Sequence, residues 1–259
     1  MTDLRVMISG SGRMGRQVAA AVLAEPGMAP AGYVDGLAEP GVIDGLPLFN
    51  DARAACNDLK PDLVIDFTNA AWTPNLADAC LAGGVRMVIG TTGLNDEFKT
   101  WLESEALARK VGVVMAANFA IGGVLMMHFA KLASPFFEYA EIIELHHEMK
   151  VDSPSGTAKT TAEMMRAARD KDFQHSDSEK EPLPGARGAA FGGVSLHSVR
   201  LPGLVAHQEV IFGGLGQTLT IRHDSTGRDS FMPGVIMAAR EVMKIDHLVV
   251  GLDALFGLS

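Results

Sequence analysis

Residues that can transfer protons and bind anions are concentrated in one short segment of the chain. This segment, residues 144–158, reads Glu-Leu-His-His-Glu-Met-Lys-Val-Asp-Ser-Pro-Ser-Gly-Thr-Ala. The imidazoles of His146 and His147 and the ammonium group of Lys150 suit the protonation of an anionic substrate near neutral pH. Gly156 and Thr157 stand where a helical pattern begins, and free N–H groups at a helix N-terminus bind carboxylates. The segment therefore predicts a site at which an anionic substrate is bound and protonated.

Two other interpretations of this segment stay open. Adjacent residues of a strand point to opposite faces, so one of the two histidines can be purely structural. A metal site is the second interpretation, but neighbouring histidines do not easily bind one ion and no third ligand is evident. We expect no metal. Four later cations are expected to be exposed or salt-bridged: Arg200, His207, His223 and Arg228.

A glycine-rich turn near the N-terminus has the features of a dinucleotide-binding site. Glycines in such a turn let backbone N–H groups approach a pyrophosphate at the start of a helix. Asp35 follows twenty residues after the last of these glycines, where a carboxylate would bind the ribose. Asp35 favours NADH as the cofactor, while Arg13 in the turn leaves NADPH open. The alternative interpretation is a tight turn that binds no ligand. The candidate residues are Gly10, Ser11, Gly12, Arg13, Met14 and Gly15.

Two further loops follow expected strands and would lie at the same edge of a sheet. The first reads Gly90-Thr91-Thr92-Gly93, and the second begins after the strand at 111–116. Their small and hydroxyl residues can line a nicotinamide ring, although each loop can equally be an ordinary turn. The candidates in the second loop are Ala116, Ala117, Asn118 and Phe119.

The elements that would position these loops alternate along the first half of the chain. Apolar strands without polar alternation indicate a parallel sheet that is covered on both faces. The expected strands cover residues 4–9, 31–34, 63–67, 85–89 and 111–116. The expected helices cover residues 14–23, 74–82 and 95–108. The pattern predicts an α/β fold with a Rossmann-like, doubly wound parallel sheet.

The second half predicts an α+β domain with a mixed or antiparallel sheet. Residues 140–147 alternate apolar and polar, as in a strand with one wet face. A helix is expected from 156 to 170, and the charged, Pro-containing stretch 171–188 is expected to be a mobile loop. Three strands joined by antiparallel hairpins follow at 194–199, 208–212 and 217–222.

The expected domain boundaries follow from this change of pattern. A dinucleotide-binding domain would comprise residues 1–117, with 226–259 packing back onto it through a helix at 231–243 and the apolar tail 248–258. Residues 118–225 would form the substrate-binding and oligomerisation domain.

An acidic composition with few cysteines narrows the classes of protein. The 259 residues include 22 Lys and Arg against 31 Asp and Glu, a formal charge of −9, which argues against nucleic-acid binding. Cys56 and Cys80 lack CxxC spacing and predict neither a disulfide framework nor a zinc site. No signal peptide is evident, and the uncharged run 111–130 is expected to form a strand, a loop and a buried helix rather than a membrane span. We therefore expect a soluble cytoplasmic protein.

Taken as one pattern, residues 144–158 closely resemble the signature of the 4-hydroxy-tetrahydrodipicolinate reductase family, also called dihydrodipicolinate reductase. Four other blocks of the chain are similar to the family's blocks and occur in its order, at residues 12–16, 64–68, 88–93 and 116–119. The segment from Gly216 to Arg228 is also similar. The chain departs from many relatives at two places: its glycine turn is one residue shorter, and an Asp-Gly pair stands at 35–36. These departures leave the choice between NADH and NADPH open, with a leaning to NADH.

The resemblance implies an activity and roles for the candidate residues. The family reduces 4-hydroxy-tetrahydrodipicolinate, a dicarboxylate of the diaminopimelate and lysine pathway, and is a cytoplasmic homotetramer built through the sheet of its second domain. By resemblance, His146 would be the general acid and Lys150 a second proton donor. His147, Gly156 and Thr157 would hold a substrate carboxylate. The glycine turn and Asp35 would bind the adenine half of the cofactor, and the loops at 90–92 and 116–119 its nicotinamide half.

Two functions from other classes were weighed against this one. A semialdehyde dehydrogenase shares the glycine turn but needs an activated thiolate, and neither cysteine has the context for one. A non-catalytic, NAD-sensing regulator needs a surface for nucleic acid or a partner, which the charge of −9 disfavours for DNA.

Overall fold

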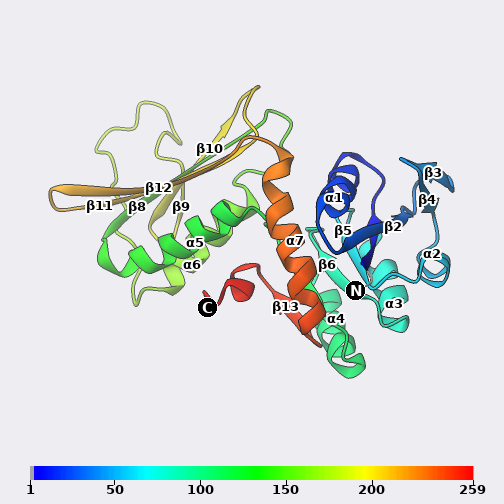
Figure 1. The fold of residues 1–259 in the computed structure, drawn as a ribbon. Coiled ribbons are helices and arrows are strands. Elements are labelled where there is room, and N and C mark those ends of the chain that lie inside the picture. The colour runs from blue at the N-terminus through cyan, green and yellow to red at the C-terminus, as the bar shows by residue number, and fades with distance from the viewer. Residues whose placement is uncertain (1–2, 259) are drawn as a thin grey trace. The chain divides into compact units, whose positions relative to one another are not determined.

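The computed structural model describes residues 3–258, which divide into two compact units (Figure 1). Unit 1 runs to Phe119 and resumes at Phe231, and unit 2 comprises Ala120–Ser230. The chain thus leaves unit 1 once and returns to it after unit 2. Among the described residues, no helix is long and apolar enough to cross a membrane.

Unit 1 is built on an eight-stranded sheet, in the order β13-β7-β6-β5-β1-β2-β4-β3. All neighbouring strands are parallel except the β3–β4 pair, which is antiparallel. The predicted Rossmann-like fold is confirmed. Its strands are β1 (Leu4–Ser9), β2 (Met28–Val34), β3 (Gly41–Ile43), β4 (Leu46–Phe49), β5 (Leu63–Asp66), β6 (Arg86–Ile89), β7 (Val113–Met115) and β13 (Leu248–Val250).

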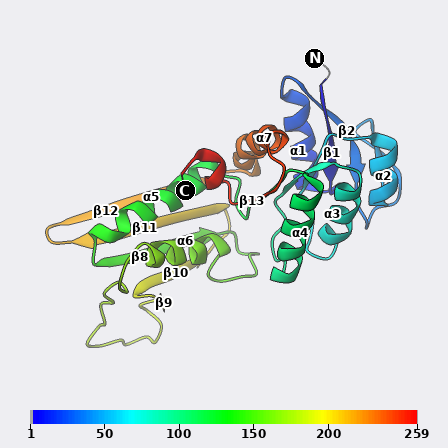
Figure 2. The same ribbon diagram turned by 90° about the horizontal axis from the view of Figure 1, so that it is seen from below.

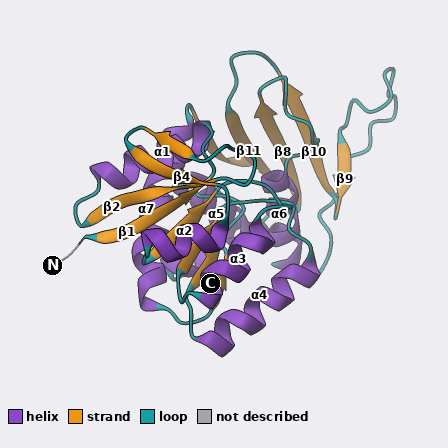
Figure 3. Ribbon diagram, turned by 90° about the vertical axis from the view of Figure 1, so that its right-hand side faces the viewer, coloured by secondary structure: helices purple, strands orange, loops and turns teal. Residues whose placement is uncertain are grey.

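Helices cover both faces of this sheet. On one face α1 (Arg13–Ala24) packs against α7 (Met232–Glu241). On the other, α2 (Ala52–Leu59), α3 (Thr73–Ala82) and α4 (Asp96–Arg109) lie side by side (Figure 3). Two of these helices begin at capping side chains, because Asp51 accepts from Ala54 N at 2.7 Å and Asn95 from Phe98 N at 2.8 Å.

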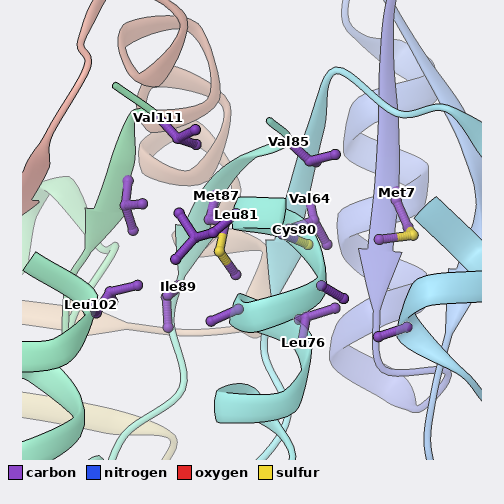
Figure 4. Close-up of a cluster of buried hydrophobic side chains, with 14 of the residues drawn as sticks. Met7, Val64, Leu76, Cys80, Leu81, Val85, Met87, Ile89, Leu102 and Val111 are labelled. Carbon is purple, nitrogen blue, oxygen red and sulfur yellow. The ribbon is translucent and has the colours of Figure 1, made fainter. Parts of the chain in front are cut away.

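The apolar runs of the strands are explained by burial on both faces. A core of fully buried side chains fills the space between the sheet and α2–α4 (Figure 4). Neighbouring residues of one strand point to opposite faces, so a strand buried on both sides needs no polar alternation. Members of this core include Met7, Val64, Leu76, Cys80, Leu81, Met87, Ile89 and Leu102.

Unit 2 consists of a five-stranded mixed sheet with two helices on one face (Figure 2). The helices are α5 (Ile121–Ala133) and α6 (Gly156–Ala167). The sheet order is β12-β11-β8-β10-β9, with β8 in the centre. The strands are β8 (Tyr139–His146), β9 (Ala189–Phe191), β10 (Val194–Arg200), β11 (Ala206–Gly214) and β12 (Gln217–Ser225).

One expected connection in unit 2 is wrong. The sequence predicts three strands joined by antiparallel hairpins, but β10 pairs with β8 in parallel and β8 separates it from β11. The chain leaves β8 through α6 and the stretch 168–188, which holds neither helix nor strand, and so returns in the same direction as β8. Only β11 and β12 form the expected antiparallel hairpin.

Short elements were missed between residues 36 and 62 and at two edges. The sequence analysis gave no strand for β3, β4, β9 or β13 and no helix for α2. β2 also begins earlier than expected, at Met28, although Pro30 lies inside it. These elements are three to eight residues long, and patterns of that length carry little periodicity.

Candidate functional site

The glycine turn between β1 and α1 leaves the start of the helix open. Gly10 has a φ of +99°, which favours glycine, and a Cβ at Gly15 would lie 1.8 Å from the Gly10 carbonyl oxygen. Gly12 caps α1 without a side-chain hydrogen bond, and a Cβ there would meet nothing within 4 Å. No side chain therefore caps the first N–H groups of α1, which is the arrangement that lets a pyrophosphate approach them.

Asp35 lies directly after β2 and is bonded to this turn. Its carboxylate accepts from Ser11 N at 2.9 Å, Ser11 Oγ at 2.6 Å and Leu37 N at 3.1 Å. Burial acts to raise the pKa of Asp35, but the hydrogen bonds from Ser11 and Leu37 outweigh it and lower the pKa. Asp35 is thus an anion fixed at the end of β2, where a ribose hydroxyl can donate to it.

Trp72 covers the residue that follows Asp35. A Cβ at Gly36 would lie 2.4 Å from the Trp72 ring, and the indole N–H donates to Ser9 Oγ at 3.1 Å. The ring therefore fills the space in which a side chain at position 36 would stand.

A buried aspartate side chain at the end of β5 ties the neighbouring loops together. Asp66 ends β5 and is fully buried. It accepts from Thr68 Oγ1 at 2.7 Å, Thr73 Oγ1 at 2.7 Å and Thr91 Oγ1 at 2.8 Å. Thr91 in turn accepts from Thr68 N at 2.9 Å. The side chain of Asp66 thus joins the loops after β5 and β6 to the start of α3.

The loops after β5 and β7 meet at an aromatic contact, and the loop after β6 packs under the same ring. A Cβ at Gly90 would lie 2.0 Å from the Phe67 ring, so glycine is required there. Phe67 packs edge-on against Phe119, with ring centroids 5.3 Å apart. Of the other candidates in these loops, Thr91 and Ala116 are buried, Asn118 is half-buried, and Thr92 and Ala117 are exposed. All the predicted cofactor residues therefore belong to unit 1, and the turn and loops have a form that fits a dinucleotide.

In unit 2, a buried glutamate organises the proton-transfer segment. Glu144 lies on β8 with its side chain 1% exposed. It contacts His146 Nδ1 at 2.5 Å and accepts from Arg200 Nη1 at 2.8 Å, Arg200 Nη2 at 2.7 Å and Ser155 N at 3.2 Å. Burial alone would raise the pKa of Glu144, yet the hydrogen bonds from His146, Arg200 and Ser198 lower it to about 2. Glu144 is therefore ionised at neutral pH.

This ionised glutamate predicts an acid-sensitive fold. A lowered pKa stabilises the native state above about pH 4.5, and the contribution is lost as the pH falls toward 2. Between about pH 5.5 and about pH 3 the contribution lost is about 2 kcal/mol. We expect the wild type to lose about 2 kcal/mol more of its unfolding free energy over this range than Glu144→Gln, as measured by urea unfolding. Glu148→Gln, an exposed carboxyl of the same segment, is the control, and equal pH dependence in wild type and Glu144→Gln would contradict the assignment.

The other predicted substrate residues surround the start of α6. Gly156 is its first residue, Thr157 is half-buried, and Ser155 caps it by accepting from Ala158 N at 3.2 Å. Lys150 Nζ donates to Asp152 at 2.6 Å, and this hydrogen bond, with a further one from Gly156 N–H, lowers the pKa of Asp152. The ammonium group of Lys150 and the N–H of Gly156, both expected to contact the substrate, thus hold the carboxylate of Asp152.

His147 and the remaining cations have different positions. His147 is exposed just beyond β8, and Arg228 is also exposed. His207 is paired with Asp224 at 2.7 Å, and the ring of His223 lies where a Cβ at Gly122 would be 2.6 Å away. Arg228 and His207 match the expectation of an exposed or salt-bridged side chain, whereas His223 is half-buried against α5. Arg200 is also salt-bridged as expected, but to the glutamate that contacts His146.

The two cysteines lie close together in unit 1, whereas the histidine cluster belongs to unit 2. Cys56 and Cys80 lie with their sulfur atoms 3.9 Å apart between α2 and α3. The hydrogen bond with Cys56 and burial raise the pKa of Cys80. Within residues 3–258, no group of three or more His, Cys, Asp or Glu is arranged to hold a metal ion.

Comparison with known protein families covers nearly the whole chain. A model described as "Dihydrodipicolinate reductase, N-terminus" matches residues 4–119, and one described as "Dihydrodipicolinate reductase, C-terminus" matches residues 122–256. The chain is 47% identical to 4-hydroxy-tetrahydrodipicolinate reductase of Geobacillus thermodenitrificans, over 96% of this chain and 98% of the relative. It is 45% identical to the enzyme of that name from Listeria monocytogenes serotype 4b, over 96% and 98%.

Solved structures agree with these sequence relatives. Dipicolinate-bound dihydrodipicolinate reductase from Paenisporosarcina sp. TG-14 has a TM-score of 0.88 and 42% identity, covering 98% of this chain and all of that one. Amine dehydrogenase from Mycobacterium smegmatis has a TM-score of 0.66 over 97% of this chain and 96% of its own, at 13% identity, which shows a shared fold alone.

Proposed function

The chain belongs to the dihydrodipicolinate reductase family and is an NAD(P)H-dependent reductase of the diaminopimelate and lysine pathway, and we propose that its own substrate is 4-hydroxy-tetrahydrodipicolinate. The observation that carries the assignment to residues is the cluster around His146, in which an imidazole is held by a buried carboxylate near the N-terminus of α6. The alternatives of a semialdehyde dehydrogenase and an NAD-sensing regulator are set aside by this membership.

The substrate carboxylates would bind at the start of α6. Thr157, Gly156 and His147 supply donors there, and Lys150 supplies a positive charge. The chain's own Asp152 already bonds to Lys150 at 2.6 Å, which supports the affinity of this position for a carboxylate. Binding of the substrate would replace that contact. Holding the ring in one orientation by its carboxylates can lower the barrier by several kcal/mol.

The proton would come from His146, with Lys150 as a second donor. In the reaction, the substrate loses its C4 hydroxyl as water, the same carbon gains a hydride, and the enamine-like position gains a proton. The nicotinamide, when bound, supplies the hydride. His146 suits the proton transfer because an imidazole can act as a general acid and because Glu144 holds the ring.

The cofactor would be held by unit 1. The open N-terminus of α1, at residues 10–15, would bind the pyrophosphate and Asp35 the adenine ribose. Residues 90–92 and 116–119 would hold the nicotinamide half. Asp66 would keep Thr91 in place without touching the cofactor.

We further propose a preference for NADH. Asp35 is anionic and would repel a 2′-phosphate, and Trp72 excludes a side chain at position 36 that could bind one. We expect Asp35→Ala to weaken NADH binding about tenfold or more while changing NADPH binding little, because it removes a ribose contact and a repulsive charge together. Quenching of tryptophan fluorescence by each cofactor measures both dissociation constants. An unchanged NADH-to-NADPH ratio would contradict the proposal.

Oligomeric state and location are proposed from the family resemblance. We propose a cytoplasmic homotetramer that assembles through the sheet of unit 2. Both helices of this unit lie on one face of the sheet. Ile143, Leu145 and Ile211 are half-buried and alternate with core residues of β8 and β11, so they belong to the other face. Light scattering should give about four times the chain mass of 27.4 kDa, and a monomer would contradict the proposal.

The activity itself is tested directly. Purified protein should oxidise NADH or NADPH when it is given the condensation product of pyruvate and aspartate semialdehyde. Absence of turnover with both cofactors would overturn the substrate assignment.

A further inference from the structure

We propose that Glu144 and Arg200 are a positioning pair for His146, which fixes Nε2 as the ring nitrogen that exchanges the catalytic proton; this inference rests on the proposed role of His146 as general acid. Neither residue is expected to touch the substrate. Their function would be to hold one imidazole in one orientation and one tautomer.

The strand geometry brings the three side chains together. Glu144 and His146 are two residues apart on β8 and therefore project from the same face. On the neighbouring parallel strand, Arg200 of β10 is the register partner of His146, and Ser198 is the partner of Glu144. The pairing of β8 with β10 therefore brings Arg200 to Glu144 and His146, although it lies far from them in the sequence.

The contact between Glu144 and His146 determines the position of a proton. An ionised carboxylate can only accept hydrogen bonds, and Glu144 is ionised at neutral pH. The 2.5 Å contact therefore requires a proton on His146 Nδ1. In the neutral imidazole Nε2 is then bare, and in the imidazolium Nε2 carries the proton that can leave. Glu144 thereby selects Nε2 for proton transfer.

Arg200 fixes the carboxylate that fixes the imidazole. Its two Nη groups bind the two carboxylate oxygens of Glu144 at 2.8 and 2.7 Å, a bidentate geometry that a lysine cannot reproduce. The same guanidinium donates to the carbonyl oxygens of Val199 at 2.7 Å and Asp152 at 2.7 Å. Arg200 therefore also anchors the backbone of the loop that carries Lys150.

The charges of this cluster balance. The charged groups that face His146 are Glu144 from β8 and Arg200 from β10, with the Lys150–Asp152 pair on the following loop. The opposing residues of β11, Ala206 and Gln208, do not titrate, and the N-cap residue of α6, Ser155, contributes its backbone N–H. Because the charge of Arg200 offsets that of Glu144, the glutamate can orient the imidazole without retaining its proton permanently.

A purely structural ion pair makes different predictions from a positioning pair. The test uses Glu144→Gln and Arg200→Gln in the full-length protein, with Glu148→Gln as the matched control. We expect Glu144→Gln to lower kcat about 100-fold with KM changed less than about threefold, because orientation and tautomer act on the chemical step. The alkaline limb of the pH–rate profile should move to lower pH in Glu144→Gln and to higher pH in Arg200→Gln, since the variants remove opposite charges.

Nitrogen NMR of labelled imidazole gives a readout that is independent of activity. In the wild type, neutral His146 should carry its proton on Nδ1, and in Glu144→Gln a mixture of tautomers should appear. Arg200→Lys keeps the positive charge but not the bidentate hydrogen bonding of the guanidinium. Its pH profile should therefore match that of the wild type, while its kcat should stay below the wild-type value. A retained Nδ1–H tautomer in Glu144→Gln, or shifts of the pH limb in the same direction for both variants, would overturn the inference. Full activity in His146→Gln would instead overturn the proposed acid role.

Discussion

Replacing His146 with glutamine is expected to lower kcat by about 10²- to 10⁴-fold, the range over which general acids contribute to rate. Glutamine is close to histidine in size and can still donate a hydrogen bond to Glu144, so the substrate pocket should be preserved. It cannot release a proton to the substrate. We therefore expect KM to change by less than about threefold, since the interaction that is lost belongs to the transition state.

Steady-state oxidation of NADH with saturating substrate measures this effect. His147→Gln is the matched control, because the neighbouring imidazole is proposed to bind a carboxylate. That variant should raise KM with a smaller effect on kcat. A His146→Gln variant with near-normal kcat would show that another group is the acid, and Lys150→Met would then be the next variant to examine.

The parts of this protein that the sequence could predict are those encoded by neighbouring residues. The glycine turn, Asp35 and the start of α6 are each defined within a few residues of the chain. Fully apolar strands followed by helices predicted the parallel sheet of unit 1 because burial on both faces leaves no alternation. These features required no knowledge of which strands are neighbours.

The parts that could not be predicted depend on contacts between distant residues. Arg200 and Glu144 are separated by 56 positions, and they meet only because β10 lies parallel to β8. The Pro-Gly turn after β10 suggested a hairpin with β11 instead, which would have placed Arg200 elsewhere. The position of Asp66 at the end of its strand was visible, but its link to Thr91 spans 25 positions. The sequence could therefore indicate His146 as a candidate proton donor, but not the groups that hold its ring.

Substitutions at two glycines of the turn should separate the effect on stability from the effect on cofactor binding. Gly15→Ala places a Cβ 1.8 Å from a backbone oxygen, so the turn must shift. We expect its unfolding free energy to fall by about 1–3 kcal/mol, as for other overpacked sites, and its NADH affinity to fall with it. Gly12→Ala meets nothing within 4 Å and has a φ of −76°, which alanine adopts freely, so its stability should change by less than about 0.5 kcal/mol.

For Gly12→Ala, cofactor binding should change instead. Its methyl group would stand where backbone N–H groups approach the pyrophosphate, so the NADH dissociation constant should rise about tenfold or more. Thermal unfolding without cofactor and NADH titration by calorimetry measure the two effects separately. Gly41→Ala on β3 is the control, because its Cβ also meets nothing within 4 Å and it lies outside the turn. If Gly12→Ala bound NADH as tightly as Gly41→Ala does, the pyrophosphate would not lie against the start of α1, and the site would have to be sought in the loops held by Asp66.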